Sequence, residues 1–442
     1  MGIVTRVASS LQEMVGAMAE DVARRCPVVL RRRKFTTATL ARTFVFGFLS
    51  HPRASDEQLA QVAGLFGVHL TTQALEQRFT PRLAAFLEAL FREASGRVIG
   101  AQAALAPILE RFAAVYLLDS TVESLPEQQR DRFPGCGGSH GGGRAAMKLQ
   151  VLWELRGGAL QAVRVEAGRH CDYKTPLQAA PPTPGSLRIA DLGYFDTEVL
   201  QRIAAAGAYF LSRLQYGTSA FSPEGQPLPL LDWLGRQGGP FVDRRVLVGT
   251  ERKVACRIIA WRLPEEQANR RRQELIAEAR RKDGRTPGAG RLAWCDWTIL
   301  ITNAPPGLLG PEEAAVLYRA RWQIERLFRR WKSQGLIDEL AGSTATRQMV
   351  RVWSRLLAVL VQHWVMLSTA WGAARCSLDK AWEAIRARAL LLARALDDLT
   401  RLEYELGQLR DTLATTAKQN KHKKPSTFEL LNDPEQLDYA LT

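Results

Sequence analysis

The sequence predicts an α/β protein in which a sheet-forming middle lies between helical regions at the two ends of the chain. Apolar residues recur at helical spacing over the first hundred residues and again after residue 332, whereas short apolar runs separated by turn residues begin at Phe112. The 442-residue chain is long enough for about three domains of roughly 150 residues each. With 46% hydrophobic and 24% charged residues, it can bury a sizeable core.

The charge balance indicates a polyanionic partner. The chain carries 60 lysines and arginines against 45 aspartates and glutamates, which gives a net charge of +15. Cations that neutralise phosphates release counterions, and this release drives association with nucleic acid. An acidic membrane surface would also attract such a chain, but the sequence has no run of 18 apolar residues and no signal-peptide pattern. We therefore expect a cytoplasmic protein that binds nucleic acid and no membrane.

Sulfur and imidazole ligands are scattered along the chain. The six cysteines form no Cys-x-x-Cys pair, and the six histidines do not fall at zinc spacing. Free thiols of this kind are typical of a reducing cytoplasm. A metal site in this chain would therefore consist of carboxylates, which suit hard Mg²⁺ or Mn²⁺ rather than zinc.

A helical hairpin near the N-terminus is a candidate DNA reader. Ser55 and Gln58 form a capping box, a turn follows at Gly67, and a second helix starts near Thr71 or Thr72. Two short helices joined by such a turn fit either a helix-turn-helix or a plain helical hairpin. A basic cluster upstream favours DNA binding, although it also fits a solvated face. The candidate DNA-binding residues here are Arg31, Arg32, Arg33, Lys34 and, on the second helix, Arg78.

Strand-like runs alternate with turns over the middle of the chain. The expected elements are strands at 113–118, 146–155, 160–166 and 187–190, a helix at 197–206 and a strand at 209–214. This is the order of an RNase H-like core, whose first and fourth strands lie side by side, so that carboxylates at their ends meet. Asp119 and Asp191 follow those two strands. An aspartate there is also a common turn former, and Glu123, Asp172 and Asp196 are competitors nearby.

A charged motif follows on a predicted helix. Tyr318, Arg321, Glu325 and Lys332 fall within a sector of roughly 60° when each residue advances by about 100°. One helix face thus presents a carboxylate flanked by two cations and a phenol, which suits a metal-bound phosphodiester. The alternative is a salt-bridged amphipathic helix, but its apolar stripe leaves Tyr318, Arg321 and Lys332 unexplained.

The spacing of these four residues resembles the Y-(2)-R-(3)-E-(6)-K signature of a large family of bacterial insertion-sequence DDE transposases. These have an RNase H-like catalytic domain and a β-rich insertion. The segments around the two aspartates are similar to the family as well, since Asp119 precedes Ser-Thr and Asp191 precedes Leu-Gly-Tyr. The resemblance covers roughly residues 40 to 370 and implies a catalytic triad of Asp119, Asp191 and Glu325.

The resemblance implies metal-dependent chemistry on DNA. Two ions of Mg²⁺, for which Mn²⁺ can substitute, would lie about 4 Å apart and assist in-line displacement at phosphorus. Tyr318, Arg321 and Lys332 would grip phosphates near the cleaved end, where a freed 3′-hydroxyl forms a hairpin before strand transfer. The implied partners are the terminal inverted repeats, target DNA and a second copy of the chain in a homodimer, with the complex at the bacterial nucleoid.

A tryptophan precedes the signature. Trp297 stands 28 residues before Glu325, where the family places a tryptophan that stacks on a flipped base. Such stacking is worth roughly 1 to 3 kcal/mol. A tryptophan at a strand end is also an ordinary packing residue, and Trp294 is an alternative stacking residue.

The interval between Asp191 and Glu325 is longer than an RNase H-like core requires, so about 90 residues are inserted. Strands are expected there at 246–249, 254–263 and 297–302, with a basic helix at 264–282. The predicted division is a helical N-terminal DNA-binding domain at 1–108, the first part of the core at 109–216, a β-rich insertion at 217–304, the second part with the signature helix at 305–370, and a helical C-terminal region with a basic tail at 371–442.

Two further alternatives remain open from the sequence. A long periodic stretch from 378 to 413 fits either pairing with a second subunit or an intramolecular bundle. The rival functions are another RNase H-like nuclease and a catalytically inactive DNA-binding repressor or domesticated transposase. The intact triad and signature favour the active enzyme.

Overall fold

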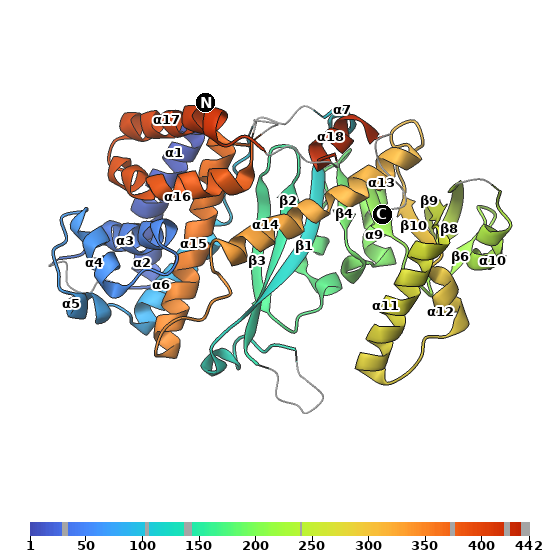
Figure 1. The fold of residues 1–442 in the computed structure, drawn as a ribbon, viewed down its shortest axis with the longest axis horizontal. Helices are drawn as coiled ribbons and strands as arrows, with labels where there is room; N and C mark the ends of the chain where they lie inside the picture. The colour runs from blue at the N-terminus through green and yellow to red at the C-terminus, as the bar shows by residue number, and fades with distance from the viewer. Residues whose placement is uncertain are drawn as a thin grey trace. The chain divides into compact units, whose positions relative to one another are not determined.

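The computed structural model describes residues 1–28, 34–101, 106–136, 144–238, 241–371, 376–419 and 425–434. The chain forms two compact units, each assembled from separated segments. Unit 1 comprises Met1–Ala104, Asp119–His170 and Ile324–Lys421, and unit 2 comprises Leu105–Leu118, Cys171–Gln323 and His422–Thr442. Helices occupy both ends of the chain and strands its middle (Figure 1), which confirms the predicted α/β class.

Unit 1 is built around helix α15 (Ala345–Thr369), most of whose residues are buried. By length and composition α15 could cross a bilayer, yet 94% of its apolar stretch is buried inside the molecule. It packs against α1 (Ile3–Glu13), α3 (Thr37–Ser50) and α6 (Pro81–Ala94), which lie around it in Figure 1. Its apolar length is therefore that of a core helix, covered by other helices and, at His363, by the turn between Glu154 and Leu160.

The expected helical hairpin is present in unit 1. Helix α4 (Asp56–Gly64) begins at the Ser55 capping box, and α5 (Thr72–Glu76) begins at the Thr71 cap. Gly67 lies between them with φ +75°, a left-handed conformation that glycine adopts at little cost. Helix α5 has five residues, so the second helix of the hairpin is short.

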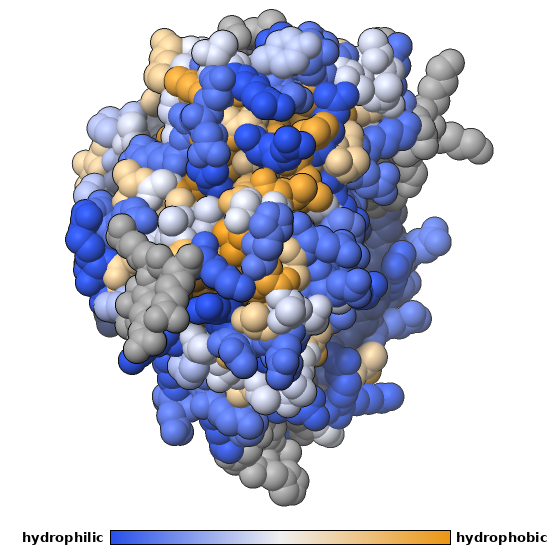
Figure 2. Space-filling view, turned by 90° about the vertical axis from the view of Figure 1, so that its left-hand side faces the viewer, coloured by the Kyte–Doolittle hydropathy of each residue, from blue (hydrophilic) through white to orange (hydrophobic). Residues whose placement is uncertain are grey.

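Two helices occupy the long periodic stretch from 378 to 413. Helix α16 (Leu378–Ala395) and α17 (Leu399–Thr416) are separated where the Asp398 side chain accepts a hydrogen bond from the Arg401 N–H and caps α17. Both helices pack on α15, and α16 also packs on α3, so they form a bundle within the chain. Figure 2 shows this side of the molecule, where hydrophilic side chains surround small hydrophobic areas.

Strands β2 (Ala146–Glu154) and β3 (Leu160–Ala167) form the expected antiparallel hairpin of unit 1. The turn between them contains Gly158 at φ +71°. The Trp153 indole donates a hydrogen bond of 2.9 Å to the Gly158 carbonyl and fixes this turn. The glycine pair in the sequence thus marks the hairpin correctly.

Unit 2 contains a sheet in the order β1-β4-β5-β10-β9-β8-β6-β7. Its strands are β1 (Val115–Ser124), of which 115–118 belong to this unit, β4 (Leu187–Ala190), β5 (Tyr209–Arg213), β6 (Ala220–Phe221), β7 (Pro227–Leu228), β8 (Phe241–Val248), β9 (Val254–Arg262) and β10 (Trp297–Thr302). Strands β1, β4 and β5 run parallel, and β10 is antiparallel to β5. The first and fourth strands are therefore neighbours, as the sequence predicted.

The pairing of β1 with β4 stops at Leu118 and Ala190, which are register partners. The next residue on each segment is an aspartate, Asp119 or Asp191. The expectation that the first strand ends at residue 118 is wrong, because β1 continues to Ser124. Asp119 thus lies inside a strand, at the point where the pairing with β4 ends.

The strands expected between 217 and 304 are present and continue the same sheet, since β10 pairs with β5 on one side and β9 on the other. Helix α9 (Thr197–Ala205) packs against β5 and β9, and the basic helix α11 spans Glu265–Asp283. The core of unit 2 gathers apolar side chains from these elements, including Phe210, Ile258 and Ile301.

Short elements complete the two units. They are the π-helix Met14–Met18, α2 (Ala19–Arg25), α7 (Pro107–Glu110), α8 (Pro176–Ala179), α10 (Leu230–Gly235), α12 (Ala289–Trp294), α13 (Pro311–Ala320), α14 (Trp322–Ser333), α18 (Thr427–Asn432) and the 3₁₀ turns Glu127–Gln129, Asp172–Lys174 and Leu192–Tyr194. Helices α13 and α14 carry the signature motif.

Candidate active site

The four signature residues lie on two helices rather than on one. Helix α13 ends just before Arg321 and α14 begins just after it, although the Arg321 backbone keeps helical angles (φ −51°, ψ −35°). The expectation of a single uninterrupted helix is therefore wrong. Tyr318 and Arg321 belong to unit 2, whereas Glu325 and Lys332 belong to unit 1.

In unit 2, Asp191 and Arg321 lie beside each other. Arg321 Nη2 is 3.8 Å from Asp191 Oδ1, and the arginine side chain is 9% exposed while the aspartate side chain is 47% exposed. Asp191 follows β4 directly and precedes the 3₁₀ turn Leu192–Tyr194. The structure thus brings one predicted triad residue and one signature cation together.

Tyr318 is buried between two guanidinium groups. Its ring centroid is 5.4 Å from Arg213 Cζ and 5.9 Å from Arg321 Cζ. Burial raises the pKa of the Tyr318 hydroxyl, and the neighbouring Arg213 opposes that shift. The hydroxyl therefore stays a neutral donor at physiological pH, which suits a contact to a phosphate oxygen.

Two cations of this region were missed by the sequence reasoning. Arg213 is the last residue of β5, and Arg271 on α11 donates hydrogen bonds to Trp297 O (3.4 Å) and Thr298 Oγ1 (3.2 Å). Burial lowers the pKa of Arg271, and the nearby charge of Arg213 lowers it further. The position of Arg213 at the end of the strand after Asp191 was a readable signal, whereas Arg271 belongs to the basic helix expected at 264–282 and was not singled out there.

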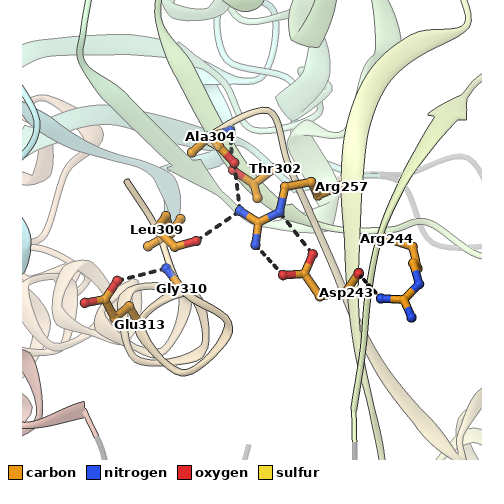
Figure 3. A network of polar contacts seen from close by, with 8 residues as sticks. All are labelled: Asp243, Arg244, Arg257, Thr302, Ala304, Leu309, Gly310 and Glu313. Carbon is orange, nitrogen blue, oxygen red and sulfur yellow. Dashed lines mark hydrogen bonds and ion pairs between the residues drawn. The ribbon is translucent and has the colours of Figure 1, made fainter. Parts of the chain in front are cut away.

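The segment that leads into α13 is held by a buried arginine (Figure 3). Arg257, 4% exposed, binds both carboxylate oxygens of Asp243 at 3.0 and 2.5 Å. The same guanidinium donates to the carbonyls of Ala304 (2.8 Å) and Leu309 (3.0 Å). The loop between β10 and α13 is therefore tied to the sheet just before the helix that carries Tyr318.

The two candidate tryptophans are partly buried and pack against the core of unit 2. Trp297 starts β10 and is half-buried, and Trp294 ends α12. The Trp294 ring lies edge-to-face with the exposed Tyr216 at 5.4 Å. Both tryptophans have a packing role, and each keeps part of its surface accessible.

In unit 1, Glu325 stands in the first turn of α14, where a negative charge interacts favourably with the helix dipole. It lines an open pocket of about 660 Å³ together with Thr121, Arg329 and Lys332. Arg53 also lines this pocket and forms an ion pair of 3.0 Å with Glu339. The pocket therefore brings together the carboxylates of Glu325, Asp338 and Glu339 and the cations of Arg53, Arg329 and Lys332.

Lys332 is anchored to strand β1. Its Nζ lies 3.2 Å from Glu123 Oε1 and donates to the Val122 carbonyl at 3.1 Å. Glu123 is fully buried and accepts a hydrogen bond of 2.9 Å from the Thr121 hydroxyl. Burial raises the pKa of Glu123, while Lys332 and Thr121 oppose the shift. Glu123 appeared in the sequence only as a rival carboxylate, and its partner Lys332 could not be read from spacing.

Asp119 is half-buried, and its Oδ1 accepts a hydrogen bond of 2.8 Å from the Ser120 N–H. Asp119 and Glu325 belong to unit 1 and Asp191 to unit 2. Among the residues that the structure describes, no group of three or more His, Cys, Asp or Glu side chains is close enough to hold a metal ion. The donors of the predicted triad are all carboxylate oxygens, which match hard divalent cations.

The predicted N-terminal DNA contacts fall partly outside the described residues, where Arg31, Arg32 and Arg33 lie. Lys34 donates a hydrogen bond of 3.2 Å to the carbonyl of His69, in the turn before α5. Arg78 follows α5, which ends at Glu76, so the expectation that it lies on the second helix is wrong. It is exposed, and its guanidinium lies 5.7 Å from the ring of buried Phe35. Lys34 and Arg78 thus both lie at the helical hairpin.

The family model and the known proteins to which the chain is similar are all described as transposases. A family model described as a transposase DDE domain matches residues 110–361, a segment that contains the predicted triad and the signature. The chain is 25% identical over 374 residues, 79% of its length, to the transposase for insertion sequence element IS231B of Bacillus thuringiensis subsp. berliner, and covers 77% of that protein.

Two further relatives come from other bacteria. The chain is 24% identical over 330 residues, 69% of its length, to the transposase for insertion sequence element IS1151 of Clostridium perfringens, and covers 68% of that protein. It is 30% identical over 230 residues, 50% of its length, to the putative transposase InsL for insertion sequence element IS186A of Escherichia coli K12, and covers 61% of that protein.

Proposed function

The chain belongs to the family of proteins that carry a transposase DDE domain, and from this premise we propose that it is the transposase of an insertion sequence. It cleaves DNA strands at the inverted-repeat ends of its own element, forms a hairpin at each end, and joins the opened ends to target DNA. Its net charge of +15 supports a DNA partner, because counterion release favours binding of a basic protein to phosphates.

In this proposal Asp119, Asp191 and Glu325 form the catalytic triad. The observation that carries it is the register between Leu118 and Ala190, because the next residue of each segment is an aspartate. Residues two apart on a strand share a face, so Asp119 lies on the same face of β1 as Leu117, and Asp191 is the residue directly after β4. Glu325 lies in the first turn of α14 and lines a pocket, which supports it as the third carboxylate.

The triad would hold two Mg²⁺ ions, with Mn²⁺ as a substitute. When bound, these ions supply Lewis-acid stabilisation of the charge that develops during displacement at phosphorus. The side chains of the protein orient the DNA. Arg321 forks onto a phosphate oxygen, Lys332 places a point charge at a neighbouring phosphate, and the neutral Tyr318 donates its hydroxyl. Arg213 adds positive charge beside the Tyr318 ring.

Trp297 stacks on a base flipped out of the transposon end in this scheme. Its half-buried position at the start of β10 supports this, because packing fixes one part of the ring and leaves another accessible. Stacking of one base on an aromatic side chain contributes roughly 1 to 3 kcal/mol, enough to hold an extruded nucleotide.

The remaining parts of the chain take supporting roles. Residues 109–216 and 305–370 form an RNase H-like core, 217–304 its insertion, and 371–442 a helical C-terminal region. Residues 1–108 read the inverted repeat, with contacts from Arg31, Arg32, Arg33, Lys34 and Arg78. The enzyme acts in the cytoplasm, at nucleoid DNA, as a homodimer that brings two ends together.

End cleavage tests the proposal. DNA that carries the flanking terminal repeats is incubated with native chain, Glu325→Gln, or Glu312→Gln as a charge-matched control on α13. Native chain and Glu312→Gln should cleave with Mg²⁺ or Mn²⁺, whereas Glu325→Gln should bind the DNA and leave it intact. Equal binding with no cleavage by any of the three proteins would favour a DNA-binding repressor instead.

A further inference from the structure

Glu123 is a buried acid beside the pocket that contains Glu325. It is 0% exposed, lies on β1 four residues after Asp119, and has one oxygen, Oε2, with no hydrogen-bond partner among the described residues. Strand alternation puts Asp119, Thr121 and Glu123 on one face of β1. A buried carboxylate in this position requires a compensating cation.

Lys332 is that cation, and β1 holds it at two points. An ammonium group has three N–H donors. One lies 3.2 Å from Glu123 Oε1 and a second reaches the Val122 carbonyl at 3.1 Å. The Lys332 side chain remains 34% exposed and lines the same pocket as Glu325, so its third donor is available to a ligand there.

The position of Lys332 on α14 places its anchored ammonium on the same side of the helix as Glu325. Lys332 stands seven residues, about two helical turns, after Glu325, so the two side chains project from the same face of α14. Anchoring at β1 fixes a long, flexible side chain before DNA binds, which reduces the rotamer freedom lost on binding. Glu123 is fully buried and is not among the residues that line the pocket, so the ammonium is the group of this pair that reaches it.

We propose that Glu123 is a positioning residue that holds the Lys332 ammonium with its third donor directed to a DNA phosphate in the Glu325 pocket. The inference rests on the proposed strand-cleavage function and extends it to a residue that acts through Lys332. Thr121 is the second support, because its hydroxyl donates to the same carboxylate oxygen at 2.9 Å. Glu123 itself contacts neither metal nor DNA in this scheme.

A double-mutant cycle tests the inference. Single-turnover end cleavage with Mg²⁺ is measured over a range of DNA concentrations for native chain, Glu123→Gln, Lys332→Met and the double variant. Glu123→Gln should lower the rate at saturating DNA by about tenfold, the worth of one charge-assisted hydrogen bond, with little change in half-saturation. In the Lys332→Met background, Glu123→Gln should have no further effect.

The other possible outcomes of the cycle separate a failure of the proposed function from a failure of this inference. An inactive native chain would overturn the proposed function and this inference with it. An active native chain whose two single effects multiply in the double variant would overturn the inference alone, because Glu123 would then act independently of Lys332, as a metal ligand would. A native rate in Glu123→Gln would overturn it as well. Glu127→Gln, at an exposed site after β1, is the charge-matched control and should keep the native rate.

A second measurement remains valid if Glu123→Gln binds DNA poorly. Acetylation of individual lysines, followed by mass spectrometry, reports how strongly each ammonium is held in its charged, unreactive form. Without DNA, Lys332 should react several-fold faster in Glu123→Gln than in the native chain, while exposed Lys253 in unit 2 should react at an unchanged rate. Equal reactivity of Lys332 in the two proteins would contradict the anchoring.

Discussion

The guanidinium of Arg321 lies 3.8 Å from the carboxylate of Asp191, measured from Nη2 to Oδ1. Arg321 is nearly buried, so this positive charge is fixed in place next to a proposed metal ligand. A fixed cation at that distance repels a divalent ion bound by the same carboxylate. In the proposed mechanism the same group also binds a phosphate oxygen, so its two expected effects on catalysis have opposite signs.

Replacing Arg321 by Gln should separate these effects. The apparent affinity for Mg²⁺ should rise by about threefold to tenfold as the repulsion is removed, whereas the rate at saturating Mg²⁺ should fall by about a hundredfold as a phosphate contact is lost. Single-turnover cleavage as a function of Mg²⁺ concentration measures both. Arg319→Gln, two residues away, is the matched control, and an unchanged metal dependence in Arg321→Gln would contradict the prediction.

Changing Asp119 to Cys should alter the metal preference. A thiolate is a softer ligand than a carboxylate, so cleavage with Mg²⁺ should be lost while Mn²⁺ restores part of it. The measurement is the ratio of cleavage rates in the two metals, with Asp131→Cys, at an exposed site in the same unit, as the control. Equal loss in both metals would argue against Asp119 as a metal ligand.

Replacing Arg257 by Met should destabilise unit 2. Asp243 would lose its partner, and the carbonyls of Ala304 and Leu309 would lose their shared donor, with a cost of about 3 to 5 kcal/mol. Hydrogen exchange at β9 and α13 measures this locally. Arg244→Met removes an exposed arginine from the adjoining position and should change stability by less than about 0.5 kcal/mol.

The pH dependence of unit 1 should depend on His363. Burial lowers the pKa of this imidazole from 6.5 to about 4, although its Nε2 lies 2.8 Å from the Gly158 carbonyl. Between pH 6.5 and pH 4, the imidazole of His363 binds a proton in the unfolded chain but stays neutral in the folded chain. The free energy of unfolding is therefore highest above pH 6.5 as far as this group is concerned, and it falls as the pH drops towards 4. The total loss is about 3 kcal/mol at most.

Urea unfolding at pH 7, 6 and 5 checks this expectation. The native midpoint should fall with pH more steeply than that of His363→Gln, in which the titrating group is absent. His51→Gln, at an exposed histidine, should follow the native curve. Parallel curves for native chain and His363→Gln would mean that other groups control the acid response.

Much of the fold was readable because its signals are local. The Ser55 capping box, the Gly158 turn and the short apolar strands each depend on residues close in sequence, and the structure has these elements where they were expected. The cap at Asp398 was also present in the sequence, so the division of the long stretch after residue 378 was predictable. The break at Arg321 was not, because its backbone angles stay helical.

The site was harder to read where its contacts are distant in sequence. The triad and signature residues stood out through their neighbours and spacing, and their joint role stays a prediction. The ion pair of Glu123 with Lys332 joins residues from separate segments, and Arg213 reaches Tyr318 from a different strand. Spacing along the chain contains no information on such contacts, since they depend on how the strands and helices pack.

The discontinuous make-up of unit 1 has a consequence for synthesis on the ribosome. Helices α3 and α6 emerge early, yet their main packing partner α15 begins at Ala345, after all of unit 2 except its C-terminal segment has been translated. Until then the nascent N-terminal helices lack the surface that buries their apolar faces. A product truncated before Ala345 would therefore expose these faces and become a target for chaperones or proteases, so that only a nearly full-length product yields a folded unit 1.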